Sequence, residues 1–171
     1  CGMIALMKCS FLVLMIVPGF LLVPSSYAQK KSVSQEMSQA LSKEPRDSKT
    51  LVQKGKMFFD PKDSKPYSGR IFIHVSLSGK RILDHRGLLL SGKREGLWRG
   101  FHDGGIPMWQ VAFKGGKRYG PHTSWRKDGS KNYEVPFEHD QMHGLFQSWG
   151  PAGKPLYRMQ FKKGSGVAVY F

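Results

Sequence analysis

The stretch FKGGKRYG at residues 113–120 resembles LLSGKREG at residues 89–96, which lies 24 residues earlier. The same 24-residue offset leads to FEHDQMHG at residues 137–144 and to FKKGSG from residue 161. Self-similarity at a fixed period of this length indicates a repeat protein, in which one supersecondary unit is copied along the chain. The sequence is therefore predicted to build its fold from one repeated unit.

Each unit places the same residue types at the same spacing. A unit begins with glycine, and then carries an aromatic residue, a turn glycine, a second aromatic residue and a closing phenylalanine. In the three later units these positions are Gly96, Gly120 and Gly144; Phe101, Trp125 and Trp149; Gly105, Gly129 and Gly153; Trp109, Tyr133 and Tyr157; and Phe113, Phe137 and Phe161. An earlier unit, from Gly69 to Gly96, follows the same plan with three extra residues.

Alternation within each unit predicts a β-hairpin. Trp109, Val111 and Phe113 are separated by single residues, and this period of two is typical of a strand with one apolar face. The Asp-Gly and glycine residues between the two halves supply the positive φ that tight hairpin turns need. Successive hairpins are expected to give an all-β fold over residues 51–171. This fold would be an elongated, single-layered antiparallel β-meander with a 24-residue period.

The recurring aromatic residues are predicted to form the core of this sheet, because regular spacing is typical of packing. In the first strand of each unit, alternation pairs Leu97 with Phe101, Pro121 with Trp125, and Leu145 with Trp149 on one side. The predicted core comprises Phe101, Trp125, Trp149, Trp109, Tyr133, Tyr157, Phe113, Phe137 and Phe161. On this interpretation, Trp125→Ala would melt the sheet.

Residues 1–28 have the pattern of a secretory signal peptide. Lys8 precedes an apolar run at residues 11–23, and Ser26 and Ala28 have the spacing of a small-residue cleavage site. The alternative is an uncleaved membrane anchor, because the apolar stretch is only slightly shorter than the roughly 17 to 25 residues of a spanning helix. Cleavage after Ala28 is the favoured interpretation. It predicts an exported protein, periplasmic or secreted, with no transmembrane span after cleavage.

Residues 29–50 are predicted to be a flexible polar linker, because they contain few large apolar residues and no aromatic residue. A short helix around Val33–Leu41 would end near Pro45. Both cysteines, Cys1 and Cys9, lie in or before the apolar run. The remaining chain therefore offers neither a disulfide framework nor a thiolate metal site.

The chain is strongly basic, with 27 Lys and Arg residues against 12 Asp and Glu residues and a net charge of +15. Only Lys8 of these charged residues lies in the predicted signal peptide. Such a balance favours an acidic partner: an acidic protein, anionic lipid headgroups or acidic polysaccharide. A solvated surface that keeps the protein soluble is the alternative.

Several basic residues recur at the repeat offset. Lys93 and Arg94 match Lys117 and Arg118, while Lys114, Lys162 and Lys163 fall in corresponding loops. These residues are expected to project from one long edge of the meander, where they could bind a row of acidic groups multivalently. The alternative is that lysines at loops and edges prevent sheets from aggregating.

Candidate catalytic chemistry is sparse, and the sequence predicts no enzyme, no cofactor and no metal site. His139 and His143 lie close together beside Glu138 and Asp140. A solvated loop is favoured over a metal site there, because divalent ions need a preorganised set of ligands. No nucleophile triad, phosphate-binding loop or pair of catalytic carboxylates stands out.

The spacing of glycine and aromatic residues resembles the MORN repeat, in the variant found in bacterial YwqK-type proteins, which are commonly labelled antitoxin components of toxin-antitoxin systems. The resemblance covers residues 51–171, most strongly from residue 89. It implies an elongated single-layered sheet used for protein or lipid contact and for scaffolding, without catalysis. The chain departs from the pattern at His122, which stands where other units have Trp98 and Phe146.

Three classes of function remain after these observations. The favoured one is an exported, non-catalytic module for binding or scaffolding that contacts an acidic protein or an anionic envelope surface. The alternative is an antitoxin-like neutraliser of a partner toxin, which would act in the cytoplasm and therefore conflicts with a signal peptide. Nucleic-acid binding is disfavoured, because exported proteins rarely meet nucleic acid and the aromatic residues are expected to be buried.

Overall fold

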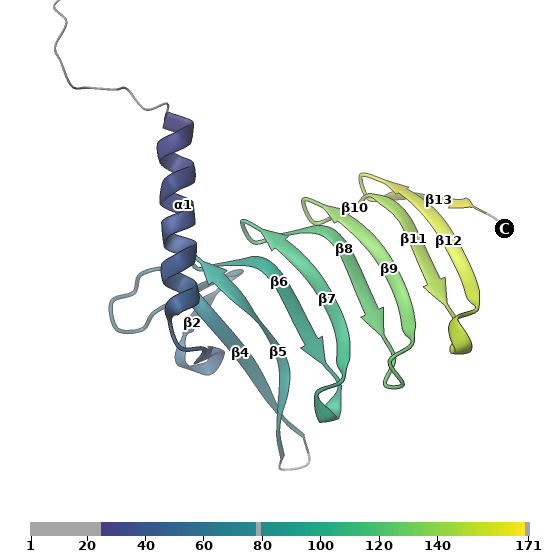
Figure 1. Ribbon diagram of the computed structural model, residues 1–171, viewed down its shortest axis with the longest axis horizontal. Helices are drawn as coiled ribbons and strands as arrows, with labels where there is room; N and C mark the ends of the chain where they lie inside the picture. Colours follow the sequence, from purple (N-terminus) through teal and green to yellow (C-terminus); the bar gives the residue numbers. More distant parts are fainter. Residues whose placement is uncertain (1–24, 78–79, 170–171) are drawn as a thin grey trace, which may run out of the picture.

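The alternating segments of each repeat form strands that pair with their sequence neighbours (Figure 1). In this computed structural model, which describes residues 25–77 and 80–169, the main sheet has 11 strands. Its order is β1-β4-β5-β6-β7-β8-β9-β11-β12-β13, with β10 paired to β9. The β1–β4 pair is parallel, and the hairpin pairs from β4 to β13 are antiparallel. The predicted all-β meander is confirmed.

The bounds of the elements follow the repeats from β4 onwards. The strands of the main sheet are β1 (Arg46–Asp47), β4 (Gly69–Leu77), β5 (Lys80–Leu90), β6 (Lys93–Phe101), β7 (Pro107–Lys114), β8 (Lys117–Trp125), β9 (Lys131–Glu138), β10 (Gln141–Met142), β11 (Gly144–Trp149), β12 (Pro155–Lys162) and β13 (Ser165–Val169). A separate hairpin is formed by β2 (Val52–Lys54) and β3 (Met57–Phe59). The helices are α1 (Ser25–Ser42) and the 3-10 turns η1 (Ser48–Thr50), η2 (Asp103–Gly105) and η3 (Pro151–Gly153).

The turns on one long side of the sheet repeat with the period of the sequence. At the β5–β6, β7–β8, β9–β10 and β12–β13 turns, both central residues have positive φ, as type I′ hairpin turns require. The second of these residues is Gly92, Gly116, Asp140 or Gly164, and its N–H donates to a carbonyl of the preceding unit. The acceptors are Tyr67, Arg94, Arg118 and Met142 respectively. One bond therefore ties each turn to the turn before it.

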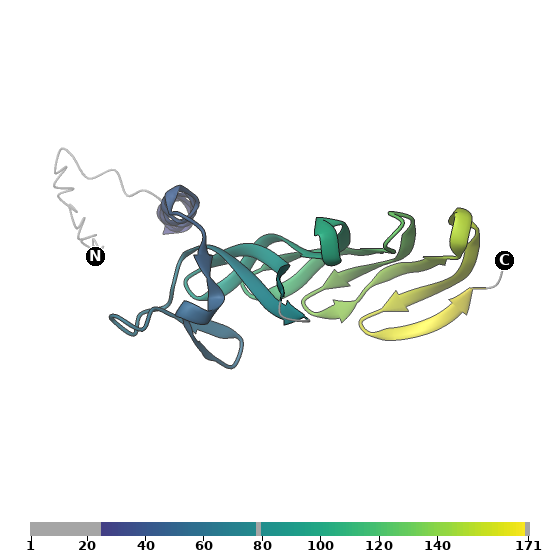
Figure 2. The ribbon, with the colours of Figure 1, turned by 90° about the horizontal axis from the view of Figure 1, so that it is seen from below.

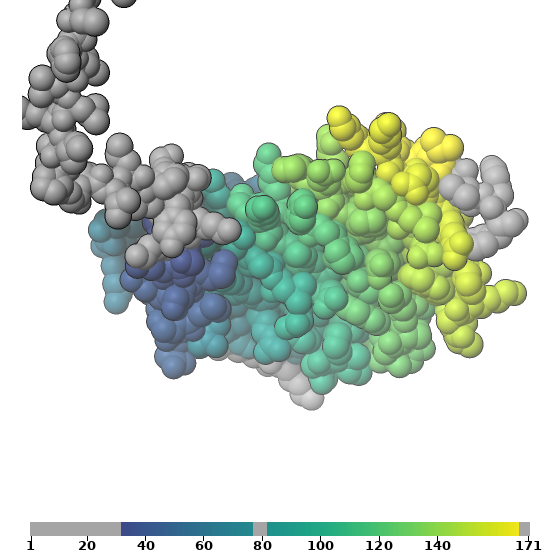
Figure 3. Space-filling model, turned by 45° about the horizontal axis from the view of Figure 1, so that its top comes forward, coloured from purple at the N-terminus to yellow at the C-terminus, as the bar shows by residue number. Residues whose placement is uncertain are grey.

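The turns on the opposite side are tied together by side chains. The ring of His102 lies with Nε2 3.0 Å from the carbonyl oxygen of Trp125, so this nitrogen carries the proton and donates it. Arg126, at the equivalent position of the next unit, donates to the carbonyl of Trp149 and, at 2.7 Å, to that of Lys131. The β8–β9 hairpin is thus bonded to both neighbouring hairpins on this side as well. Figures 2 and 3 show the units following one another along the molecule in sequence order.

The buried face of the sheet differs from the predicted one in the first strand of each unit. Trp98 is fully buried, whereas Leu97 is 43% exposed and Leu145 is 37% exposed. The predicted core residues Phe101, Trp125 and Trp149 are only half-buried. The reason is the pairing register: Trp98 lies opposite Val111 and Leu97 lies opposite Ala112, so that the face of Trp98, and not the face of Leu97, is the buried one.

In the second strand of each unit, the predicted alternation is largely confirmed. Val111, Phe113, Val135 and Phe137 are buried. Tyr157, near the C-terminal end, is instead 40% exposed. Burial therefore declines along the sheet from the first repeats toward the last.

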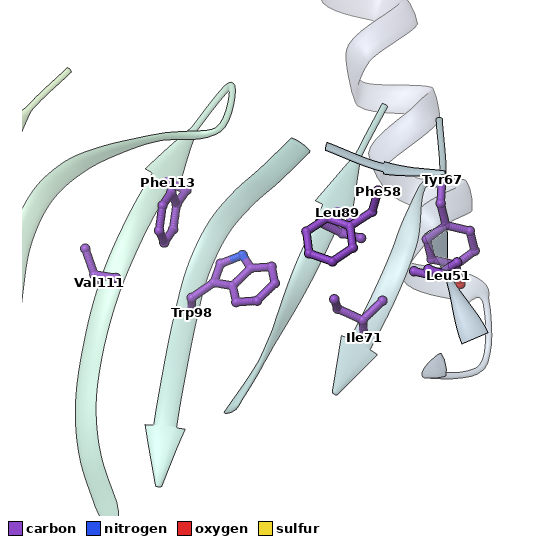
Figure 4. Close-up of a cluster of buried hydrophobic side chains, with 8 residues drawn as sticks. All are labelled: Leu51, Phe58, Tyr67, Ile71, Leu89, Trp98, Val111 and Phe113. Carbon is purple, nitrogen blue, oxygen red and sulfur yellow. The ribbon is translucent and has the colours of Figure 1, made fainter. Parts of the chain in front are cut away.

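The main hydrophobic cluster lies at the N-terminal end of the sheet, where the β2–β3 hairpin packs against it (Figure 4). It comprises Leu51, Phe58, Tyr67, Ile71, Leu89, Trp98, Val111 and Phe113. Phe58 fixes the hairpin by two backbone bonds, donating to the carbonyl of Gly92 at 2.9 Å and accepting from the N–H of Tyr67 at 3.0 Å. The single layer predicted for the whole meander is therefore covered at this end.

The prediction of a flexible linker at residues 29–50 is corrected by the structure, which shows regular elements there. The segment contains most of α1, then β1 and η1, and α1 stands against β4 and β5 (Figure 1). Ala40 is buried, and one helical turn earlier Glu36 Oε1 accepts from the hydroxyls of Ser68 and Ser91, each at 2.7 Å. The short helix predicted around Val33–Leu41 lies within α1, but its docking was not predicted, because it rests mainly on polar bonds and the sequence has no apolar stripe.

Residues 1–24, which hold most of the predicted signal peptide, lie outside the described residues. Helix α1 begins at Ser25, before the predicted cleavage position at Ala28. Among the helices that the structure describes, none is both long and apolar enough to cross a bilayer.

Candidate binding site

The structure places the predicted partner-binding residues at hairpin turns along one long edge of the sheet, which we call the basic edge (Figure 1). Lys93 and Arg94 begin β6, and Lys117 and Arg118 begin β8. The others are Lys114 at the end of β7, Lys162 at the end of β12, and Lys163 in the turn after β12. The repeat spacing thus brings residues that are distant in sequence onto one edge.

The pairing register divides these residues between the two faces of the sheet. Phe113 lies opposite Arg118, and Lys114 lies opposite Lys117. Because directly opposed residues share a face and successive residues alternate, Arg118 faces the buried side with Phe113. Leu89 opposite Arg94 gives the same result one unit earlier. The arginines therefore line the buried face, and Lys93, Lys114, Lys117 and Lys162 line the other face.

Both arginines lie over aromatic rings. The guanidinium carbon of Arg94 is 4.7 Å from the ring centre of Trp98 and 5.4 Å from that of Phe113. That of Arg118 is 4.0 Å from the ring centre of Phe137. Burial lowers the pKa of Arg94, but an arginine side chain remains protonated throughout the physiological range. The two guanidinium groups are thus fixed cations on an apolar floor.

Arg118 has an acidic partner within the chain. Asp140 Oδ1 accepts from the backbone N–H of Arg118 at 3.0 Å and from its Nε at 3.2 Å, and Asp140 Oδ2 pairs with Lys56 at 3.3 Å. The backbone bond from Arg118 is the main reason that the pKa of Asp140 lies below its usual value. Asp140 has φ 72, a conformation that most residues other than glycine rarely adopt. The neighbouring units have glycine at this position of the turn.

Arg94 has no equivalent partner. The position corresponding to Asp140 in its unit, 24 residues earlier, is Gly116. Within residues 25–77 and 80–169, no side chain forms an ion pair or hydrogen bond with the Arg94 guanidinium, and burial is the cause of its pKa shift. A half-buried cation is therefore left without a carboxylate.

A pocket of about 340 Å³ opens beside Arg94. The β2–β3 hairpin contributes Gln53, Lys56 and Phe58 to its lining, while Arg94, Arg118 and Asp140 come from the turns of the basic edge. Three cations and one carboxylate thus surround the same space. The repeat offset in the sequence predicted Arg94 and Arg118 as binding residues. Lys56 and Asp140 were not predicted, because only the docking of the β2–β3 hairpin brings these two residues together.

A ladder of rings runs across the buried face, with one ring on each strand from β5 to β12 except β10, and His85 contacts both Trp98 and Trp109. It consists of His85, Trp98, Trp109, His122, Tyr133, Phe146 and Tyr157. Successive contacts have centroid separations from 5.5 Å for His122–Tyr133 to 6.3 Å for Tyr133–Phe146, within the range of favourable aromatic pairs. The 24-residue spacing of Trp98, His122 and Phe146 was the sequence signal for this ladder.

Burial lowers the pKa of both histidines in the ladder. For His85 it outweighs a hydrogen bond from Nδ1 to Asp84 at 2.6 Å, which acts in the opposite direction. For His122, the nearby charge of Arg118 lowers the pKa further. Each ring is therefore neutral near pH 7 and packs as a flat, weakly polar member of the ladder.

Acidification is expected to destabilise the fold through these histidines. The unfolded state binds more protons wherever the folded pKa lies below the unfolded value of about 6.5. The stability that the two neutral histidines contribute is fully present above about pH 6.5. It is lost as the pH falls from there toward their lower pKa values in the folded state. His122→Phe, which copies Phe146, is expected to reduce the fall in Tm between about pH 7.5 and about pH 5.5. Equal falls in the wild type and this variant would contradict the assignment, and His143→Phe in an exposed loop is the control.

His139 and His143 lie near Glu138, with Nδ1 to carboxylate distances of 4.0 Å and 3.9 Å. These pairs are exposed at the β9–β10 turn. In the part of the chain that the structure describes, no group of three or more His, Cys, Asp or Glu side chains is arranged to hold a metal ion.

Comparison with known proteins does not place the chain in a family. No family model matches it, and no curated protein matches it. Among solved structures, the crystal structure of TarM is similar with a TM-score of 0.31 and 9% sequence identity, over 83% of this chain and 23% of that chain. The chain thus spans less than a quarter of the TarM chain, and a likeness at this TM-score supports no inference about fold or function.

Proposed function

We propose that the protein is a non-catalytic binding module whose basic edge contacts an acidic protein. The observation that carries the proposal is the repeated placement of lysine or arginine at the β5–β6, β7–β8 and β12–β13 turns of one edge, on both faces of the sheet. Repetition turns single weak charges into a multivalent row, so that several modest contacts add. Location outside the cytoplasm remains a prediction that rests on residues 1–28.

The charges of the basic edge are mostly available for a partner. Among the described residues, none forms an ion pair with Lys93, Lys114 or Lys117, and Arg118 is the member that pairs with an acid of the chain. Charge complementarity of this kind accelerates association and selects partners of opposite sign. The partner is therefore expected to present a cluster or row of carboxylates.

A protein is favoured over a lipid surface because of the shape of the edge. The arginines are recessed beside the β2–β3 hairpin, where the pocket lies, whereas the lysines project on the other face. An acidic side chain can enter such a recess. A headgroup held in the plane of a bilayer reaches the projecting lysines more readily than the recessed arginines.

The test is binding of the purified chain to a fluorescent decaglutamate peptide, measured by anisotropy across salt concentrations. We expect salt-sensitive binding, and a loss of about tenfold in affinity for the variant Lys93→Gln/Lys114→Gln/Lys117→Gln, given about 0.2–1 kcal/mol for each exposed ion pair. The matched control, Lys62→Gln/Lys127→Gln/Lys154→Gln, removes the same charge elsewhere and is expected to lose less.

Two outcomes would contradict the proposal. Equal losses for the two triple variants would mean that net charge, and not the basic edge, determines binding. Binding to vesicles containing phosphatidylserine without binding to the peptide would assign the edge to a lipid surface. Neutral phosphatidylcholine vesicles control for adhesion that does not depend on charge.

A further inference from the structure

Two successive repeats carry an arginine at the same position, but within the described residues only one of these two arginines is paired with an acid. Arg118 is bonded to Asp140, which lies 22 residues further along the chain. Arg94 is bonded to no acid in the described part of the chain, because Gly116 occupies the equivalent turn position. The turn backbone is the same in both units, since the N–H of Gly116 donates to the carbonyl of Arg94 at 2.9 Å, and that of Asp140 donates to the carbonyl of Arg118 at 3.1 Å.

We propose that the pocket beside Arg94 binds a carboxylate from an acidic side chain of the partner protein, in the position that Asp140 takes beside Arg118. This inference rests on the function proposed above, and it adds the chemical group that is recognised and the residue that recognises it. The chain itself supplies the template, because Asp140 shows how a carboxylate fits between an arginine of this edge and Lys56.

The surroundings of Arg94 favour this ligand. The guanidinium lies over the rings of Trp98 and Phe113, which hold the group in place, and its N–H groups can donate a two-point bond to a carboxylate. A pocket of about 340 Å³ is large enough for one or two side chains. Asp140 shares the lining, so a singly charged carboxylate is repelled less than a doubly charged phosphate.

The sharpest variant is Gly116→Asp, which places the chain's own carboxylate beside Arg94. The position tolerates this residue: Gly116 has φ 85, close to the φ 72 that Asp140 already adopts. A Cβ at Gly116 would meet only the side chain of Lys93, at 3.4 Å or more. We expect the variant to fold as the wild type does and to bind the peptide at least about tenfold more weakly, although its net charge falls by one unit only.

The reverse variant, Asp140→Gly, removes the internal acid from Arg118 and restores the glycine of the other turns. It is expected to bind the decaglutamate peptide more tightly than the wild type. Asp128→Gly, at a turn on the opposite side, changes the net charge equally and is the matched control. Arg94→Gln is expected to lose affinity as Gly116→Asp does, and it decides the question if Gly116→Asp fails to fold by circular dichroism.

Competition distinguishes the sources of the anion. N-acetylglutamate α-methylamide, which carries only the side-chain carboxylate, is expected to displace the peptide from the wild type at lower concentration than inorganic phosphate, and to have no such advantage with Gly116→Asp. More effective displacement by phosphate would overturn the assignment to a carboxylate.

The outcomes also separate this inference from the function on which it rests. If the wild type binds no decaglutamate, both are wrong. If Gly116→Asp and Arg94→Gln are folded and keep wild-type affinity while the triple lysine variant of the basic edge loses it, the proposed function stands and the carboxylate pocket is overturned.

Discussion

Trp98→Ala is expected to lower the free energy of unfolding by about 3–5 kcal/mol, the usual cost of deleting a large aromatic side chain from a core. The Trp98 side chain is fully buried, and its Nε1 donates to the carbonyl of Leu88 at 3.1 Å. It also supports the guanidinium of Arg94 and lies edge-on to Phe113. The substitution leaves a cavity that the rigid strands on either side cannot close. Urea denaturation followed by circular dichroism measures the loss.

Trp125→Ala is the control, because it removes the same side chain from a half-exposed site. We expect it to cost less than half as much as Trp98→Ala, since a surface site leaves little cavity. Alternation in the sequence alone predicts a central role for Trp125. Equal losses for the two variants would support that role and would contradict the burial pattern described above.

Gly87→Ala is expected to destabilise the protein by about 1–3 kcal/mol, as overpacking of a close-packed core does. Gly87 provides the flat backbone surface against which the Trp98 ring lies, and a Cβ there would overlap the centre of the indole. Trp98 cannot move aside, because it is buried between β5 and β7. Thermal and urea denaturation are the measurements.

Gly150→Ala is the matched control for this variant. Its backbone φ of −79 suits any residue, and a Cβ would meet the side chain of Leu156 at 3.3 Å. Leu156 is 61% exposed and can turn away, so we expect a loss near zero for Gly150→Ala. A similar loss at both glycines would mean that contact with Trp98 does not explain the effect, because the lower entropy of the unfolded chain would by itself stabilise both variants.

Some signals in the sequence were sufficient to predict the buried face of the sheet, and others were not. Simple alternation predicted the buried side of β7 and β9 correctly, because those strands carry Val111, Phe113, Val135 and Phe137 without interruption. It failed in the first strand of each unit, where it placed Leu97 and Phe101 on the buried face, although Trp98 is the residue opposite Val111. This strand carries a large apolar residue on each face, at Leu97 and at Trp98, so alternation alone does not show which face is buried.

The candidate site was predictable only in part. The repeat offset was enough to place Lys93, Arg94, Lys117 and Arg118 on one edge. The division of these residues between two faces follows from pairing register, which the offset does not specify. Lys56 enters the site from the β2–β3 hairpin, 84 residues away from Asp140 in sequence, and a local pattern carries no information about such a contact.

The pairing of two strands in every repeat also fixes a distance. Neighbouring strands lie about 4.8 Å apart, so equivalent turns of successive repeats are separated by about 10 Å. An extended polypeptide advances about 3.3 Å for each residue, which makes three of its residues as long as one repeat. An extended acidic segment lying along the basic edge would therefore advance by about three residues between the turn of Lys93 and Arg94 and the turn of Lys117 and Arg118.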